Sequence, residues 1–278
     1  MASVTAPLAP HPDRLLPPDP VVRPVARRLY AAVRGLPIVS PHGHVDPRIL
    51  VDDQPFTDPT SLLIQPDHYL TRLLHAAGVS LAALGVGEGP LPEDRARAAW
   101  RLLCANWPVL RGTPVRFWLE AELAEIFGVT QRPGAASADA IYDQIADALR
   151  DPGHRPRALL RRFGIDVLAT TDDPADDLAA HADLAADPAV PTRVVPTFRP
   201  DRYLEPAAPG WADAVKRLGA VADTDVGHYD GYVAALEQRR RHFIAHGAVS
   251  ADHGHADAVA APLDRTAAAG IYSRAFAG

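Results

Sequence analysis

Residues 37–47 read PIVSPHGHVDP, and the interpretation of the whole chain depends on this stretch. The apolar pair Ile38-Val39 predicts a short strand, and two histidines follow it, one residue apart. Side chains at positions i and i+2 of an extended segment leave the same face, so His42 and His44 can reach one metal ion. The alternative for such a short motif is a pair of solvent-exposed loop histidines.

The composition is that of a folded chain with a substantial core. Of its 278 residues, 47% are hydrophobic and 22% are charged, which allows one large domain or two ordinary ones. The net charge of −6 and the pI near 6.0 create no field that attracts nucleic acid or an anionic membrane. No apolar run is long enough to span a bilayer, and one cysteine, Cys104, excludes an internal disulfide. We therefore expect a cytoplasmic protein without nucleic-acid or membrane partners.

Helical and extended patterns divide the chain into four parts. Residues 1–20 form a Pro-rich lead-in, and residues 21–47 contain a first helix and the first strand. Residues 48–163 show helical patterns only, with helices predicted over 67–78, 93–104, 116–127 and 138–149. Residues 164–278 alternate again, with strands predicted over 165–171, 193–200 and 247–255, and helices over 174–184, 211–218 and 229–246. Four strands separated by helices indicate βα units and a parallel sheet.

Polar side chains collect where each predicted strand ends. In parallel α/β folds, ligands bind outside the carboxyl ends of the strands, and barrel enzymes take their catalytic groups from that rim. No GxGxxG or GxxxxGK[ST] motif is present, which removes the usual support for a nucleotide-binding fold. The residues at the four strand ends are His42 and His44, Thr171 and Asp172, Arg199, and Asp252 and His253.

Five segments, in chain order, point to a known family. They are SPHGHVDP at 40–47, DHYLTRLLHAAGV at 67–79, LATTDDPADDLAAH at 168–181, VVPTFRPD at 194–201 and SADHG at 250–254. Together they resemble the uronate isomerase (glucuronate isomerase) family of the amidohydrolase-like superfamily. The resemblance extends over nearly all of residues 20–254.

The resemblance implies a fold, a cofactor and a reaction. The implied fold is a (β/α)8 TIM barrel with an all-helical insertion after strand 1, and a divalent metal, usually zinc, lies in its mouth. The implied reaction is the aldose–ketose isomerisation of D-glucuronate to D-fructuronate and of D-galacturonate to D-tagaturonate. By the same resemblance, His42 and His44 are metal ligands, His68 and Tyr69 contact a small-molecule hexuronate, and Arg199 binds the acid group of the sugar. Assembly into a homo-oligomer stays open.

The number of predicted strands departs from the family pattern. A (β/α)8 barrel has eight strands and about 250 residues before insertions, whereas this chain shows about four βα units and a long helical segment. We therefore expect it to correspond to the N-terminal portion of the barrel. Two alternatives stay open: a metal-dependent hydrolase of the same superfamily, and an inactive, truncated remnant of the isomerase.

Isomerisation of this kind needs an acid/base pair and an electrophile beside the reacting oxygens. The candidates for proton transfer are His68, Tyr69, Asp252 and His253, and the last two also suit a position behind the metal ligands. Arg199 has an alternative role, an ion pair with Asp172 or Asp201 at the rim. The acidic group Asp172, Asp173, Asp176 and Asp177 favours helix capping over cation binding.

Overall fold

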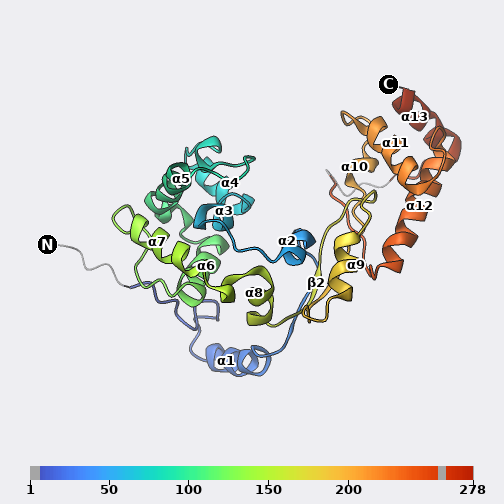
Figure 1. Ribbon diagram of the computed structural model, residues 1–278. Coiled ribbons are helices and arrows are strands. Elements are labelled where there is room, and N and C mark those ends of the chain that lie inside the picture. Colours follow the sequence, from blue (N-terminus) through green and yellow to red (C-terminus); the bar gives the residue numbers. More distant parts are fainter. Residues whose placement is uncertain (1–6, 256–260, 278) are drawn as a thin grey trace. The chain divides into compact units, whose positions relative to one another are not determined.

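The computed structural model describes residues 7–255 and 261–277 of the chain, in two compact units (Figure 1). One unit contains the described residues up to Leu36 together with Gln54–Leu159, and the other contains Pro37–Asp53 together with the described residues from Leu160 onward. Described residues of the first unit form helices and turns, and those of the second form a parallel sheet with helices. No helix in the described ranges is both long enough and apolar enough to cross a membrane.

The sheet of the second unit has three parallel strands, each next to its neighbour in sequence. Two isolated bridges, Asp172 to Phe198 and Phe198 to Ala251, continue the pairing past the strand ends. The carboxyl ends of all the strands therefore lie along one edge, which is where a parallel sheet collects its functional side chains. The strands are β1 Ile38–Ser40, β2 Ile165–Ala169 and β3 Arg193–Val195, in the order β1-β2-β3.

These strands are shorter than the sequence patterns predict. The strand predicted over 165–171 ends at Ala169, and the one predicted over 193–200 ends at Val195, because Pro196 has no N–H for the ladder. The strand predicted over 247–255 is reduced to the bridge at Ala251. Val249 is 79% exposed, so no apolar burial holds that segment in a longer ladder.

Helices of the second unit pack on the sheet and on each other. Leu50, Leu168, Leu184 and Val194 form the core between the sheet and the nearest helices, and a separate aromatic cluster centred on Trp211 holds the later helices together. The helices are α2 Pro47–Asp52, α9 Ala179–Ala186, α10 Asp201–Leu204, α11 Trp211–Ala222, α12 Tyr229–Ala245 and α13 Arg265–Ala277, while α8 Pro156–Arg162 crosses the boundary between the units.

The helix predicted over 174–184 begins later, at Ala179. The carboxylates of Asp173, Asp176 and Asp177 accept the N–H groups of the residues two positions further on and so hold the segment in turns. Leu178 has a positive φ of 60°, which a helix cannot include. These aspartates form turns before the helix, and only Asp177 bonds an N–H of α9 itself, that of Ala179; the N-cap position, Leu178, has no side-chain cap, so the predicted helix capping is found only in part.

Helices of the first unit enclose a core of their own. Residues 48–163, all of them described, contain no strand, which agrees with the helical patterns of this segment. The α-helices are α1 Val22–Val33, α3 Pro59–Leu63, α4 His68–Ala76, α5 Glu93–Ala105, α6 Pro114–Ala121 and α7 Ala138–Ala148, and the short turns are η1 Ala82–Leu84, η2 Trp107–Leu110, the π-helical turn η3 Glu122–Ile126 and η4 Pro152–His154.

Helix α5 lies in the middle of this core. Its buried residues recur three or four positions apart, as an amphipathic helix requires. Trp100 is 1% exposed, and its Nε1–H donates to the carbonyl of Ala138 at 2.9 Å. Cys104 is buried too, and burial raises the pKa of its thiol to about 12, so it behaves as an inert apolar side chain.

Two further expectations change in the first unit. The helix predicted over 116–127 ends at Ala121 and continues as the π-helical turn η3. Part of the Pro-rich lead-in, residues 1–6, lies outside the described residues. Within the rest of it, Leu8 is buried and its N–H donates to the carbonyl of Thr130 at 2.7 Å.

Candidate active site

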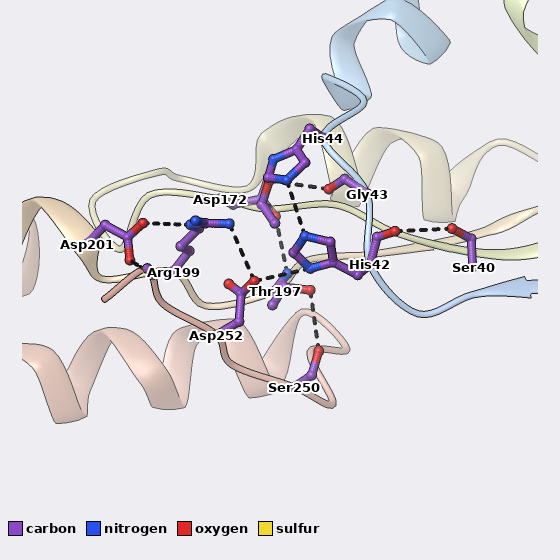
Figure 2. A network of polar contacts seen from close by, with 12 residues as sticks. Ser40, His42, Gly43, His44, Asp172, Thr197, Arg199, Asp201, Ser250 and Asp252 are labelled. Carbon is purple, nitrogen blue, oxygen red and sulfur yellow. Dashed lines mark hydrogen bonds and ion pairs between the residues drawn. The ribbon is translucent and has the colours of Figure 1, made fainter. Parts of the chain in front are cut away.

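Two histidine rings meet just beyond the end of β1 (Figure 2). The Nε2 atoms of His42 and His44 are 3.2 Å apart, and the rings are nearly perpendicular. Gly43 allows this loop to lie against β2, since a Cβ at that position would stand 3.1 Å from the carbonyl oxygen of Ala169. The predicted common face of the two histidines is therefore present.

The other ring nitrogen of each histidine has its own partner. Nδ1 of His42 lies 3.1 Å from Oδ2 of Asp252, and Nδ1 of His44 lies 2.9 Å from the Thr171 hydroxyl. A carboxylate can only accept, so the proximity of Asp252 favours a proton on Nδ1 of His42. The Nε2 of that ring then keeps a lone pair on the side that faces His44.

Arg199 reaches the same cluster from the loop after β3. Its Nη1 donates to Oδ2 of Asp252 at 3.4 Å, and its Nε donates to Oδ2 of Asp201 at 2.8 Å. The rim ion pair considered as an alternative therefore forms with Asp201, not with Asp172. Nη2 donates to no described residue, so this edge of the guanidinium is open to a further acceptor.

The ion pair shifts the pKa values of both partners. Burial alone would raise the pKa of Asp201, but the hydrogen bonds from Arg199 and from the N–H of Gly254 hold it below its ordinary value. The Asp201 hydrogen bond in turn raises the pKa of Arg199. Both groups are charged near neutral pH, and the guanidinium plane is fixed in one orientation.

One carboxylate oxygen joins the histidines to the arginine. Oδ2 of Asp252 contacts both His42 and Arg199, which come from segments more than 150 residues apart in the sequence. The other oxygen, Oδ1, is buried and has no hydrogen-bond partner among the described residues. Asp252 is therefore held by its two neighbours and positions both of them.

A buried polar group lies behind this cluster. Oδ2 of Asp172 accepts hydrogen bonds from the Thr170 hydroxyl at 2.7 Å and from the Thr197 N–H at 3.2 Å. The same hydroxyl lies 2.8 Å from Nε2 of His181. Burial raises the pKa of Asp172 and lowers that of His181, so both shifts favour the neutral forms. The group ties β2, α9 and the segment after β3 together beneath the histidines.

A cavity of about 410 Å³ opens beside His44. Its walls come from the start of α2 and from the loop between β2 and α9, and they carry several of the capping aspartates together with Arg48. Because those carboxylates already accept backbone N–H groups, the cavity wall is a set of turns and helix starts. The described residues contain no group of three or more His, Cys, Asp and Glu side chains placed to hold a metal ion.

His253 does not join the cluster. Its side chain is exposed, and its Nδ1 lies 3.0 Å from the carbonyl oxygen of Gly254. No contact with His42, Arg199 or Asp252 is found for it within the described ranges. The predicted strand end at 252–253 therefore places Asp252, and not His253, in the cluster.

His68 and Tyr69 belong to the first unit, at the start of α4. Asp67 caps this helix by accepting the N–H groups of Tyr69 and Leu70, and Tyr69 is 57% exposed. The His68 and Tyr69 rings contact each other with centroids 4.2 Å apart, and Tyr69 meets Trp118 edge-on. These contacts present both polar side chains on one exposed patch of the unit.

Glu122 adds an ionisable group near this helix start, which the sequence patterns did not single out. Burial, with a smaller contribution from the charge of Asp67, raises the pKa of Glu122 to about 7. It lies in the π-helical turn η3, a kind of distortion that occurs frequently at functional sites. Thr171, named only as a strand-end residue, contacts His44, and Asp201 is the ion-pair partner of Arg199 that was considered as an alternative.

Comparisons with known proteins agree with the resemblance. The sequence model of the family described as glucuronate isomerase matches residues 21–278. The chain is 51% identical over 266 residues to a uronate isomerase of Cutibacterium acnes, with 96% of this chain and 57% of that protein covered. A uronate isomerase of Corynebacterium efficiens is 50% identical, with 97% and 57% covered.

Solved structures show the same similarity. The crystal structure of glucuronate isomerase from Caulobacter crescentus matches with a TM-score of 0.92 and 40% identity, covering 98% of this chain and 57% of that one. Uronate isomerase from Thermotoga maritima matches with a TM-score of 0.83 and 29% identity, covering 92% and 55%. The chain thus has the α/β fold of these TIM-barrel-type proteins and spans about 57% of the length of the curated relatives it matches.

Proposed function

Because the chain belongs to the glucuronate isomerase family, we propose that it acts in the isomerisation of hexuronates, D-glucuronate to D-fructuronate and D-galacturonate to D-tagaturonate. The observation that carries this proposal is the shared oxygen of Asp252, which joins the histidine pair to Arg199. A histidine pair suits a metal, and a guanidinium suits a carboxylate. A metal bound by the histidines could contact the sugar oxygens, and Arg199 could bind the acid group, so the cluster suits a sugar acid.

The histidine pair fits a divalent metal, and we propose zinc. Two nitrogens bound to one tetrahedral zinc at about 2.0–2.1 Å stand about 3.3 Å apart, and the Nε2 atoms of His42 and His44 are 3.2 Å apart. The contact of Nδ1 of His42 with the Asp252 carboxylate is of the kind that usually supports a metal-binding histidine. When bound, a divalent metal would polarise a carbonyl or hydroxyl oxygen of the sugar. A catalytic zinc site commonly has three protein ligands, so two histidines form only part of one.

Arg199 is proposed to bind the carboxylate of the hexuronate. Asp201 and Asp252 hold its Nε and Nη1, so the free Nη2 edge is presented in a fixed orientation. A planar guanidinium binds a carboxylate with good geometry, and the ordering cost is small because the side chain is already held. The acid group of the sugar would then lie beside the histidine pair.

Proton transfer between C1 and C2 needs groups beyond this cluster. We propose that His68 and Tyr69, exposed together at the start of α4, supply a hydrogen-bond donor and a proton carrier to the sugar. Asp252 suits a positioning role better than proton transfer, since its Oδ2 already contacts two groups. His253 stays a candidate for proton transfer on its sequence position alone.

We also propose that the sheet corresponds to the first strands of a barrel. β1, β2, β3 and the bridged segment at Ala251 are parallel neighbours in sequence order, as the strands of a (β/α)8 barrel are. The helical segment 48–163 then corresponds to an insertion after the first strand. A cytoplasmic location and assembly into homo-oligomers stay predictions from the sequence.

The test measures binding and turnover of D-glucuronate by the zinc-loaded chain, with NMR to detect any ketose and calorimetry to measure affinity. Arg199→Gln removes the proposed carboxylate contact and should weaken hexuronate binding about 10- to 100-fold, the equivalent of a charge-assisted hydrogen bond. The exposed Arg202 provides a matched control, and Arg202→Gln should bind like the parent chain. Absence of saturable hexuronate binding, or hydrolysis of a uronolactone without isomerisation, would overturn the proposal.

A further inference from the structure

We propose that Thr171 is a positioning residue whose hydroxyl fixes the tautomer and orientation of the His44 ring. This inference rests on the proposed metal-binding role of His42 and His44. It concerns the nitrogen of His44 that faces away from the proposed metal and therefore assigns no additional ligand.

The direction of the hydrogen bonds follows from what each group can donate. Oγ1 of Thr171 lies 3.2 Å from the carbonyl oxygen of Gly43 and 2.9 Å from Nδ1 of His44. A carbonyl oxygen can only accept, so the single hydroxyl proton goes to Gly43. The hydroxyl then faces the imidazole as an acceptor, and the proton of the ring must lie on Nδ1. The lone pair of a neutral ring is thereby left on Nε2, on the side facing His42.

The backbone holds this hydroxyl in place. The residues on either side of Thr171 are bonded to the neighbouring segment, with the Thr170 N–H donating to Val195 and the Asp172 N–H donating to Thr197, each at 3.0 Å. Side chains alternate along an extended segment, so Thr170 and Asp172 turn toward the buried polar group while Thr171 turns the other way. Its β-branched side chain has few rotamers, which limits the hydroxyl to a narrow range of positions.

The two histidines are therefore supported in parallel ways. Nδ1 of His42 lies 3.1 Å from Oδ2 of Asp252, and Nδ1 of His44 lies 2.9 Å from the Thr171 hydroxyl. With a cation between the rings, each contact would leave Nε2 as the electron-pair donor; the two Nε2 atoms are 3.2 Å apart, within hydrogen-bond distance of each other. Groups that orient metal-binding histidines in this way typically change metal affinity 10- to 100-fold when they are removed.

The experiment compares four variants of the purified chain. Thr171→Val keeps the shape and removes the hydroxyl, Thr171→Ala removes it with less bulk, and Thr171→Ser restores it. Thr192→Val is the matched control, because the Thr192 hydroxyl donates to the carbonyl of Ile165 at 2.7 Å and contacts no histidine. Circular dichroism confirms that each variant is folded. Zinc affinity is measured by competition with a chromophoric chelator, and the His44 tautomer is measured from imidazole nitrogen chemical shifts of the metal-free chain.

We expect zinc affinity to fall about 10- to 100-fold in the Val and Ala variants and to stay within about 3-fold of the parent in the Ser and control variants. Nitrogen shifts should show the Nδ1–H form in the parent and a mixture of tautomers without the hydroxyl. A parent-like tautomer in Thr171→Val would overturn the inference, whatever the zinc result. Failure of the parent chain to bind zinc, with the tautomer shift present, would instead count against the proposed metal site.

Discussion

Replacing Asp252 by asparagine tests the contact on which the proposed site depends. The substitution keeps the shape of the side chain and removes its charge. Oδ2 of Asp252 lies 3.1 Å from Nδ1 of His42, a close ion-pair contact, and accepts a hydrogen bond from Arg199 at 3.4 Å, near the upper limit for one. The effect should therefore be larger on the histidine side than on the arginine side.

The expected magnitude follows from the strength of the His42 contact. A hydrogen bond to a charged group contributes about 1.5–3 kcal/mol, and a neutral one contributes about 0.5–1.5 kcal/mol. The difference of about 1–1.5 kcal/mol corresponds to a loss of zinc affinity of about 5- to 12-fold. Asp252→Ala removes the acceptor altogether and should approach the 10- to 100-fold losses typical of such supporting groups.

The assay is zinc titration of the purified chain, repeated with D-glucuronate. Asp201→Asn separates the two halves of the site, since Asp201 holds Arg199 and does not contact His42. We expect that variant to weaken hexuronate binding and to leave zinc affinity unchanged. Asp213, which pairs with Lys216 on the surface, provides a charge-matched control as Asp213→Asn.

Two results would refute this reasoning. Parent-like zinc affinity in both Asp252→Asn and Asp252→Ala would show that the contact to His42 does not support a metal ligand. A fall in zinc affinity of equal size in Asp201→Asn would show that net charge near the site, rather than the specific hydrogen bond, is responsible.

Two predictions concern stability. Glu122 has a pKa of about 7 in the folded chain against an ordinary value of 4.5, so the folded state holds the proton more tightly and the free energy of unfolding falls as the pH rises from 4.5 to 7. Glu122→Gln should remove this fall and raise the free energy of unfolding at pH 8 by about 1–2 kcal/mol, allowing for partial exposure. Urea unfolding at pH 4 and pH 8 measures the change. An unchanged dependence of stability on pH would contradict the prediction. Trp100→Ala should cost about 3–5 kcal/mol by the same method because Trp100 is fully buried and hydrogen-bonded. The more exposed Trp118 should tolerate the same change at under half that cost, and equal losses at both positions would argue against the described core.

Local patterns were sufficient to predict the histidine pair. In an extended segment, residues two positions apart lie on the same face, so the spacing of His42 and His44 predicts that both rings share one face. The apolar pair before them predicts the strand. The helices of the first unit were predictable for a similar reason, since the buried positions of α5 recur at helical spacing. Arg199 lies near the histidines because the loops after parallel strands share one edge of the sheet.

The remaining features depend on contacts between segments far apart in the sequence, which the periodicity of apolar residues cannot predict. The role of Asp252 arises because its loop meets both the loop after β1 and the loop after β3. Thr171 and Asp172 look alike as polar residues at a strand end, yet one faces His44 and the other faces the buried Thr170 hydroxyl. The strand predicted over 247–255 is reduced to the bridge at Ala251, because Val249 is exposed and no apolar burial holds the segment in a longer ladder.

The shared oxygen of Asp252 also has a consequence for how the two halves of the site act together. The negative charge of Asp252 is shared between contacts with His42 and with the permanently charged Arg199. A carboxylate bound at Arg199 would share the guanidinium with Asp252 and so strengthen the attraction between Asp252 and His42. A better-supported His42 is a stronger electron-pair donor, and linkage requires that the benefit is mutual. In the proposed site, a cation at the histidines and an acid at the arginine would therefore favour each other's binding.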